Sequence, residues 1–234
     1  MSNKTNTFNM LKVLFTGSTD KELQEVSNII DTYGSKFGVN TPLRVAHYLA
    51  QVREEIGTKF EPKIESLNYS EQGLINTFKV FKDNPELADM YGRDEDTPKA
   101  NQEAIGNLAY ANRMGNGNPD SDGDGDMDKD DDGFKYRGRG TLQITGKYNY
   151  QEVQKRIDKY SPNSGVNIIT GSNVDTLTGS ILIGMGFWIW KDLYRLADVG
   201  ISKEVVDSIT SVINKYTSSY AKRREHFNKI VTLI

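Results

Sequence analysis

The chain has 234 residues, no cysteine and a formal net charge of −3 at pH 7. The lack of cysteine excludes a disulfide framework, an iron–sulfur cluster and a thiol nucleophile. The 12 Tyr, 9 Phe and 2 Trp need burial, which argues against a chain that is disordered throughout. The charge is unevenly distributed: eight aspartates and one lysine between Asp120 and Asp132 give that segment −7 and leave the rest of the chain at +4. The sequence therefore predicts a mildly basic protein with one very acidic segment.

The sequence shows no targeting signal. The apolar stretch Met10–Phe15 is short and contains Lys12, so it is a poor core for a signal peptide. The most apolar run, Ile181–Trp190, is about half as long as the roughly twenty residues of a membrane-spanning helix. We therefore expect no stable membrane insertion and synthesis in the cytoplasm of a host cell. Action in the periplasm or cell wall would then require release by another protein.

Residues 1–18 are expected to form a loose N-terminal arm, followed by one domain over 19–234. Within this domain, apolar residues recur at helical spacing. Thr41-Pro42 has the residue types of a helix start, and Gly57 those of a helix end. The predicted helices cover residues 21–37, 42–55, 70–81, 101–113, 149–160, 174–193 and 202–216.

Three other segments have different patterns. Residues 58–70 and 115–133 are predicted to be loops, and the alternating character of 136–144 suggests a small β-hairpin. Gly184 and Gly186 lie inside a predicted helix, which indicates close helix packing there. The predicted fold class is therefore mainly α.

The acidic segment can be aligned with the twelve-position EF-hand calcium loop, with Gly125 at the position of the sharp turn. Clustered carboxylates repel one another unless a cation neutralises them, and their hard oxygen atoms suit Ca²⁺ better than zinc. The alternative is a solvated, flexible acidic insertion at 117–133, since the flanks do not resemble two long EF-hand helices. In the first case Ca²⁺ would be a structural ion. The candidate metal ligands are Asp120, Asp122, Asp124, Asp126, Asp128 and Asp131.

Four segments carry a resemblance to a known family. They are the helix that ends in Glu55-Ile-Gly57, then ESLNYS at 65–70, YANRMGN at 110–116 and YRGRGTLQITGKYNY at 136–150. In this order they resemble the motifs of glycoside hydrolase family 19, the chitinase-like group that includes many phage endolysins. The resemblance implies a lysozyme-like, bilobal helical domain with an active-site cleft.

The resemblance also implies roles for individual residues. Glu55 corresponds to the general acid and Glu65 to the general base, while Thr145 corresponds to the residue that holds the attacking water. By spacing alone, the two glutamates would be weak candidates, because acidic residues at helix ends are usually surface groups. The implied reaction is inverting hydrolysis of a β-1,4-linked amino-sugar polymer, which needs no cofactor. The implied substrate-binding residues are Gln143, Tyr148, Asn149, Asn214 and Arg223.

The chain departs from the family pattern at three places. Glu54 replaces the usual His before the first catalytic Glu, and adjacent helical residues point about 100° apart, so Glu54 and Glu55 cannot both face the cleft well. The loop to Glu65 differs in length from the commonest endolysin pattern, so Glu61 is a rival for the role of base. Lys215-Tyr216 replaces the glycines that normally follow Asn214. The assignment of Asn214 and Arg223 to the last segment of the cleft is therefore left undecided by the sequence.

We interpret the sequence as that of a monomeric phage or prophage endolysin acting on bacterial peptidoglycan. The forms of the 65–70 and 110–116 motifs favour an endolysin. A chitinase acting on chitin, a secreted antibacterial effector, and a non-catalytic calcium-dependent wall-binding protein of the same fold are the alternatives. Nucleic acid is not an expected partner, because the basic residues are scattered and the acidic segment would repel phosphate.

Overall fold

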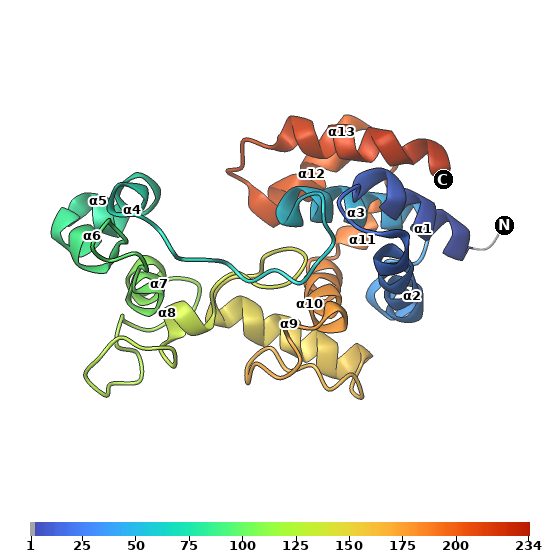
Figure 1. Ribbon diagram of the computed structural model, residues 1–234. Coiled ribbons are helices and arrows are strands. Elements are labelled where there is room, and N and C mark those ends of the chain that lie inside the picture. Colours follow the sequence, from blue (N-terminus) through green and yellow to red (C-terminus); the bar gives the residue numbers. More distant parts are fainter. Residues whose placement is uncertain (1–2) are drawn as a thin grey trace. The chain divides into compact units, whose positions relative to one another are not determined.

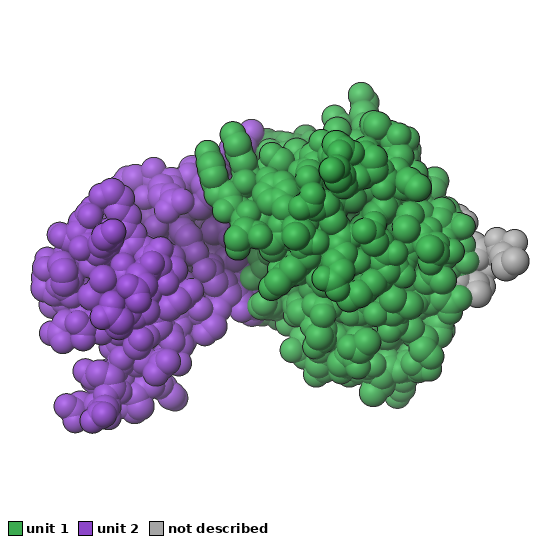
Figure 2. Space-filling model, turned by 90° about the horizontal axis from the view of Figure 1, so that it is seen from above, with its two compact units in different colours: residues 1–63, 139–143, 152–234 green, residues 64–138, 144–151 purple. Residues whose placement is uncertain are grey.

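A computed structural model of the protein describes residues 3–234 and confirms the mainly helical fold class (Figure 1). Within these residues no helix is long and apolar enough to cross a membrane. The chain divides into two compact units (Figure 2). Unit 1 comprises residues 1–63, 139–143 and 152–234, and unit 2 comprises residues 64–138 and 144–151.

Unit 1 is built around helix α3 (Pro42–Ile56), whose residues from Val45 to Val52 are all buried. Its neighbours in unit 1 include α1 (Asn3–Leu14), α11 (Leu193–Ala197), α13 (Tyr220–Ile230) and the 3₁₀ helix η1 (Val231–Leu233). Helix α9 (Lys147–Tyr160) contributes to this unit from Glu152 onward. The other described helices of unit 1 are α2 (Asp20–Phe37), α10 (Leu177–Trp190) and α12 (Lys203–Asn214).

The segment expected to be a loose arm forms helix α1 instead, so that prediction is wrong. Thr7, Met10, Leu11 and Leu14 are buried and follow the i, i+3, i+4, i+7 spacing of one helix face. Helix α1 packs on α2, α3 and α13. Lys12, which interrupts the apolar run in the sequence, is exposed and forms an ion pair with Asp20. Helix α1 is therefore amphipathic, and its apolar stripe is short. For this reason the sequence of the segment looks like that of a loose arm.

The glycines of α10 allow close packing, as the sequence predicts. A Cβ at Gly184 would clash with Thr141 Oγ1, and one at Gly186 would lie 3.0 Å from Val153 Cγ1. Thr141 hydrogen-bonds Tyr48 of α3 through its side chain, at 2.8 Å, and donates its backbone N–H to Ser180 O. Helix α10 therefore fixes the 139–143 segment within unit 1.

Unit 2 has a small core of its own, centred on Leu67, Leu74, Phe81 and Ile105. The helix predicted over 70–81 is divided, because Phe78 adopts an extended conformation, with φ −119° and ψ 130°. The helices that lie wholly in unit 2 are α4 (Glu71–Thr77), α5 (Lys79–Asp83), α6 (Pro85–Tyr91), α7 (Gln102–Tyr110) and α8 (Asp132–Lys135).

The hairpin predicted at 136–144 is not found, since the segment contains turns, bends and isolated bridge residues at Arg139 and Ile144 but no strand. Gly140 and Gln143 have φ values of 76° and 49°, in the left-handed region that no strand adopts. The N–H of Gln143 is turned back onto the carbonyl of Gly140, at 3.1 Å. The alternation in the sequence therefore reflects burial of Thr141, Leu142 and Ile144, since these residues are buried although none of them lies in a strand.

Candidate active site

Glu55 lies in the last turn of α3. The helix begins at the Thr41 cap, whose side chain accepts the N–H of Arg44, and ends at Gly57, which has a φ of 87°. Glu55 Oε1 accepts a hydrogen bond from Arg223 Nη2 of α13, at 2.5 Å. The Arg223 side chain is 2% exposed and that of Glu55 15% exposed. The first predicted carboxylate is therefore held at the surface of unit 1 by a buried cation.

Arg223 is itself fixed by a buried polar network. Its Nη1 donates to Gln51 Oε1 at 2.9 Å, and its Nε donates to Ser219 Oγ at 3.0 Å. Gln51 Nε2 donates to Thr210 Oγ1 of α12, at 3.1 Å. The substrate-binding role predicted for Arg223 stays a prediction, and the structure shows its buried guanidinium bonded to Glu55, Gln51 and Ser219.

Glu54, the residue that departs from the family pattern, also contacts α13. Its carboxylate lies 3.1 Å from His226 Nε2, and burial lowers the pKa of His226. Arg223 and His226 are three residues apart, about one helical turn. The two adjacent carboxylates of α3 therefore contact successive turns of α13: Glu55 contacts Arg223, and Glu54 contacts His226.

Glu65, the second predicted carboxylate, lies in unit 2. Its Oε1 accepts from the Tyr110 hydroxyl at 2.5 Å and its Oε2 from the N–H of Gly138 at 2.9 Å. Its own N–H donates to Gly138 O, at 2.8 Å. Burial raises the pKa of Tyr110, so this hydroxyl stays protonated and acts as a donor. Both oxygens of Glu65 are therefore held within unit 2.

Sequence reasoning missed Tyr110 and Gly138 as partners of Glu65, although both lie in the quoted motifs. Glu61, the rival base, has a different environment. It belongs to unit 1, its side chain is 55% exposed, and its carboxylate pairs with Lys59 at 2.8 Å. Because surface ion pairs of this kind fix a side chain weakly, the geometry favours Glu65 over Glu61 as an ordered carboxylate.

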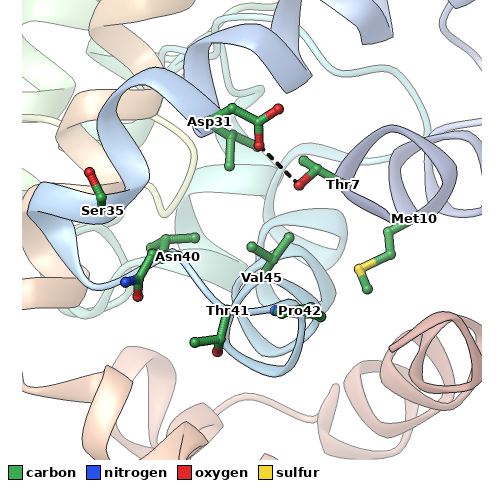
Figure 3. Close-up of a pocket in the computed structure, with 10 residues that line it drawn as sticks. Thr7, Met10, Asp31, Ser35, Asn40, Thr41, Pro42 and Val45 are labelled. Carbon is green, nitrogen blue, oxygen red and sulfur yellow. Dashed lines mark hydrogen bonds between the residues drawn. The ribbon is translucent and has the colours of Figure 1, made fainter. Parts of the chain in front are cut away.

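A cavity of about 210 Å³ in unit 1 is separate from these residues. Figure 3 shows it between α1, α2 and the start of α3, with Thr7 donating to Asp31 at 3.3 Å. None of the predicted site residues lines it.

Comparison with known proteins decides the family. No protein-family model matches the chain. A curated protein of Haemophilus influenzae, named a glycosyl hydrolase family 19 domain-containing protein, is 32% identical over 179 residues, which cover 76% of each chain. The chain belongs to glycosyl hydrolase family 19. Its class of reaction is therefore the hydrolysis of glycosidic bonds, and the chemistry of this family 19 protein needs no cofactor.

The remaining predicted residues of this family 19 protein are distributed over the two units. In unit 1, Gln143 Nε2 donates to the carbonyls of Lys63 and Gly140, at 3.1 and 3.0 Å, and Asn214 is exposed at the end of α12. In unit 2, Asn149 Nδ2 donates to Thr145 O at 2.8 Å. Tyr148 is 51% exposed. Asn214 and Tyr148 are thus the most accessible of the predicted substrate-binding residues.

The acidic segment of unit 2 brings five of its six predicted ligands together. Carboxylate oxygens of Asp120, Asp122 and Asp124 lie within 4.8 Å of one another, as do those of Asp124, Asp126 and Asp128. Repulsion by Asp124 is the largest cause of a raised pKa at Asp126. The oxygen donor set fits a hard divalent cation such as Ca²⁺.

Asp131 is the exception among the predicted ligands. It is fully buried, and its Oδ1 accepts from the N–H of Asp122 at 3.3 Å and from both the N–H and the hydroxyl of Ser121. Its Oδ2 accepts from the N–H of Asp128 at 3.1 Å. Both oxygens of Asp131 therefore accept hydrogen bonds from the segment itself, and Asp131 ties its ends together.

Proposed function

We propose that this family 19 protein is an endolysin that hydrolyses β-1,4 glycosidic bonds of bacterial peptidoglycan with inversion. The main support is that both predicted carboxylates are held by defined donors, Glu55 by Arg223 and Glu65 by Tyr110 and Gly138. The endolysin-like forms of residues 65–70 and 110–116 favour peptidoglycan over chitin. The charge of +4 outside the acidic segment suits an anionic cell wall.

In the proposed mechanism, Glu55 is the acid and Glu65 the base. Glu55 gives its proton to the leaving glycosidic oxygen as the bond from that oxygen to the anomeric carbon breaks. Glu65 takes a proton from water, whose oxygen bonds to the anomeric carbon from the opposite face. Thr145 orients this water, and Gln143, Tyr148, Asn149 and Asn214 contact the glycan. The product has the inverted anomeric configuration.

Lysis of permeabilised cells tests this proposal. We expect the protein to clear a suspension of permeabilised Gram-negative cells and to release reducing ends from purified peptidoglycan faster than from chitin. Glu61→Gln is the matched control, since Glu61 is exposed and its carboxylate pairs with Lys59 at the surface. This variant should lyse cells at the wild-type rate. Faster release from chitin would support a chitinase, and release from neither polymer would support a non-catalytic wall-binding protein.

We further propose that the acidic segment binds Ca²⁺ through the carboxylates of residues 120–128. The support is the pair of three-carboxylate groups that share Asp124. The ion would order this segment of unit 2 and take no part in the chemistry. In this proposal Asp131 is not a direct ligand, because both of its oxygens accept hydrogen bonds from the segment itself.

Removal of calcium should therefore destabilise the protein. At a Ca²⁺ concentration a hundredfold above Kd, we expect the Tm to exceed that in chelator by on the order of 5–10 °C. Asp124→Asn, which alters both carboxylate groups, should abolish this difference. Calorimetry with and without chelator measures it. A chelator that changes neither the Tm nor the lytic rate of the wild type would refute the calcium site.

A further inference from the structure

Asn107 is a fully buried amide in α7 whose side chain joins three segments of unit 2. Its Nδ2 donates to the Asp128 carbonyl at 2.7 Å and to Asp131 Oδ2 at 3.3 Å. Its Oδ1 accepts the N–H of Phe134, in α8, at 2.7 Å. One amide therefore connects α7 both to the end of the acidic segment and to α8.

Helices α7 and α8 approach each other so closely at Asn107 that their backbones touch. A Cβ at Gly133 would lie 2.5 Å from Asn107 Cα, and a Cβ at Gly106 would lie 2.9 Å from Phe134 Cα. Because neither glycine has space for a side chain, the hydrogen bonds of Asn107 lie at the point that sets the separation of the two helices.

The two donors that hold Glu65 belong to these same elements. Tyr110 is one turn beyond Asn107 on α7, and Gly138 follows the end of α8 by three residues. Arg137 links this turn to α8, since its Nη1 donates to Phe134 O at 2.9 Å and its guanidinium lies 3.8 Å over the Phe134 ring. The separation of α7 and α8 thus determines the separation of the Tyr110 hydroxyl and the Gly138 N–H.

We propose that Asn107 is a positioning residue for Glu65. By holding α8 and the end of the acidic segment on α7, it keeps the Tyr110 hydroxyl and the Gly138 N–H at the spacing that engages both oxygens of Glu65. This inference rests on the proposed role of Glu65 as the base. It also gives the acidic segment a physical connection to that base, through the Asp128 and Asp131 hydrogen bonds.

A double-mutant cycle between Asn107 and Glu65 tests the proposal. Asn107→Leu keeps the approximate volume and removes all three hydrogen bonds. We expect it to lower kcat on soluble peptidoglycan fragments by about 100-fold, the cost of a misplacement of about 1 Å, with little change in KM. In the Glu65→Gln background the same substitution should have almost no further effect on kcat, because the group it positions is already lost.

Two further variants separate positioning from loss of stability. Leu74→Ala removes a buried side chain from the core of the same unit and should lower the Tm while leaving kcat unchanged at temperatures well below it. If Asn107→Leu does not fold, Asn107→Ala enters the same cycle, since it removes the same three hydrogen bonds and introduces neither bulk nor charge beside Asp131.

Equal loss of kcat from Asn107→Leu in both backgrounds, or wild-type kcat in the single variant, would overturn the positioning role. Full activity of Glu65→Gln alone would instead overturn the proposed base, so the two failures are distinguishable.

Discussion

Replacement of Glu55 by Gln should lower the rate of glycan hydrolysis by about 10³-fold, within the range that general acid–base catalysis contributes. The amide has the shape of the carboxyl and can still accept the hydrogen bond from Arg223, but it has no proton to give to the leaving oxygen. We therefore expect the binding of peptidoglycan to stay close to that of the wild type. The Tm should fall, because the buried Arg223 guanidinium keeps a hydrogen-bond acceptor but loses its counter-charge. Initial rates of reducing-end release measure the effect.

Glu54→Gln is the matched control for this variant. Glu54 precedes Glu55 in the same turn of α3, but it contacts His226, and a glutamine there can still accept from the His226 Nε2. We expect its rate to lie within a few-fold of the wild type. If Glu54→Gln were the inactive variant and Glu55→Gln the active one, the assignment of the acid would have to move to Glu54.

Replacement of Arg223 by Leu should destabilise the protein by about 3–5 kcal/mol, the usual cost of removing one partner of a buried ion pair. The guanidinium is 2% exposed and makes hydrogen bonds to Glu55, Gln51 and Ser219. Leucine fills part of the space but leaves these oxygens without their donor. Chemical denaturation measures the loss of stability. We also expect reduced kcat, because Glu55 loses the contact that orients it.

The adjacent Arg224 provides the control for Arg223. It lies 3.5 Å from Asp207, and both side chains are 34% exposed, so Arg224→Leu should cost no more than about 1 kcal/mol. Comparable destabilisation by the two substitutions would show that the buried network does not hold α13 on α3. A double variant of Arg223→Leu and Glu55→Gln should be less destabilised than the sum of the single variants, because the carboxylate left unpaired is removed.

The sequence predicts local features of unit 1 well where a single helix carries them. The cap at Thr41 and the end at Gly57 define α3 and place Glu55 in its last turn. The two glycines in α10 predict its close packing. The sequence misleads where apolar residues are few, as in α1. The buried residues from Thr7 to Leu14 form a stripe that becomes visible only when the segment is drawn as a helix.

Interactions between distant segments were less predictable. Arg223 and Glu55 are 168 residues apart, and Tyr110 and Glu65 are 45 apart. Nothing in the local pattern around Arg223 shows that it is buried, since long basic side chains are exposed in most proteins. Asp131 illustrates the same limit, because its place in an EF-hand register does not reveal that it is buried and accepts the Asp128 N–H.

The anomeric configuration of the product tests the central claim most directly. ¹H NMR spectra recorded during digestion of soluble peptidoglycan strands show which anomer appears first, before mutarotation equilibrates the two. An inverting enzyme with Glu55 as acid and Glu65 as base must release the α-anomer from a β-1,4 bond, and we predict that the α-anomeric signal appears first. Initial release of the β-anomer would contradict the mechanism, and the absence of any new reducing end would contradict hydrolysis of this substrate.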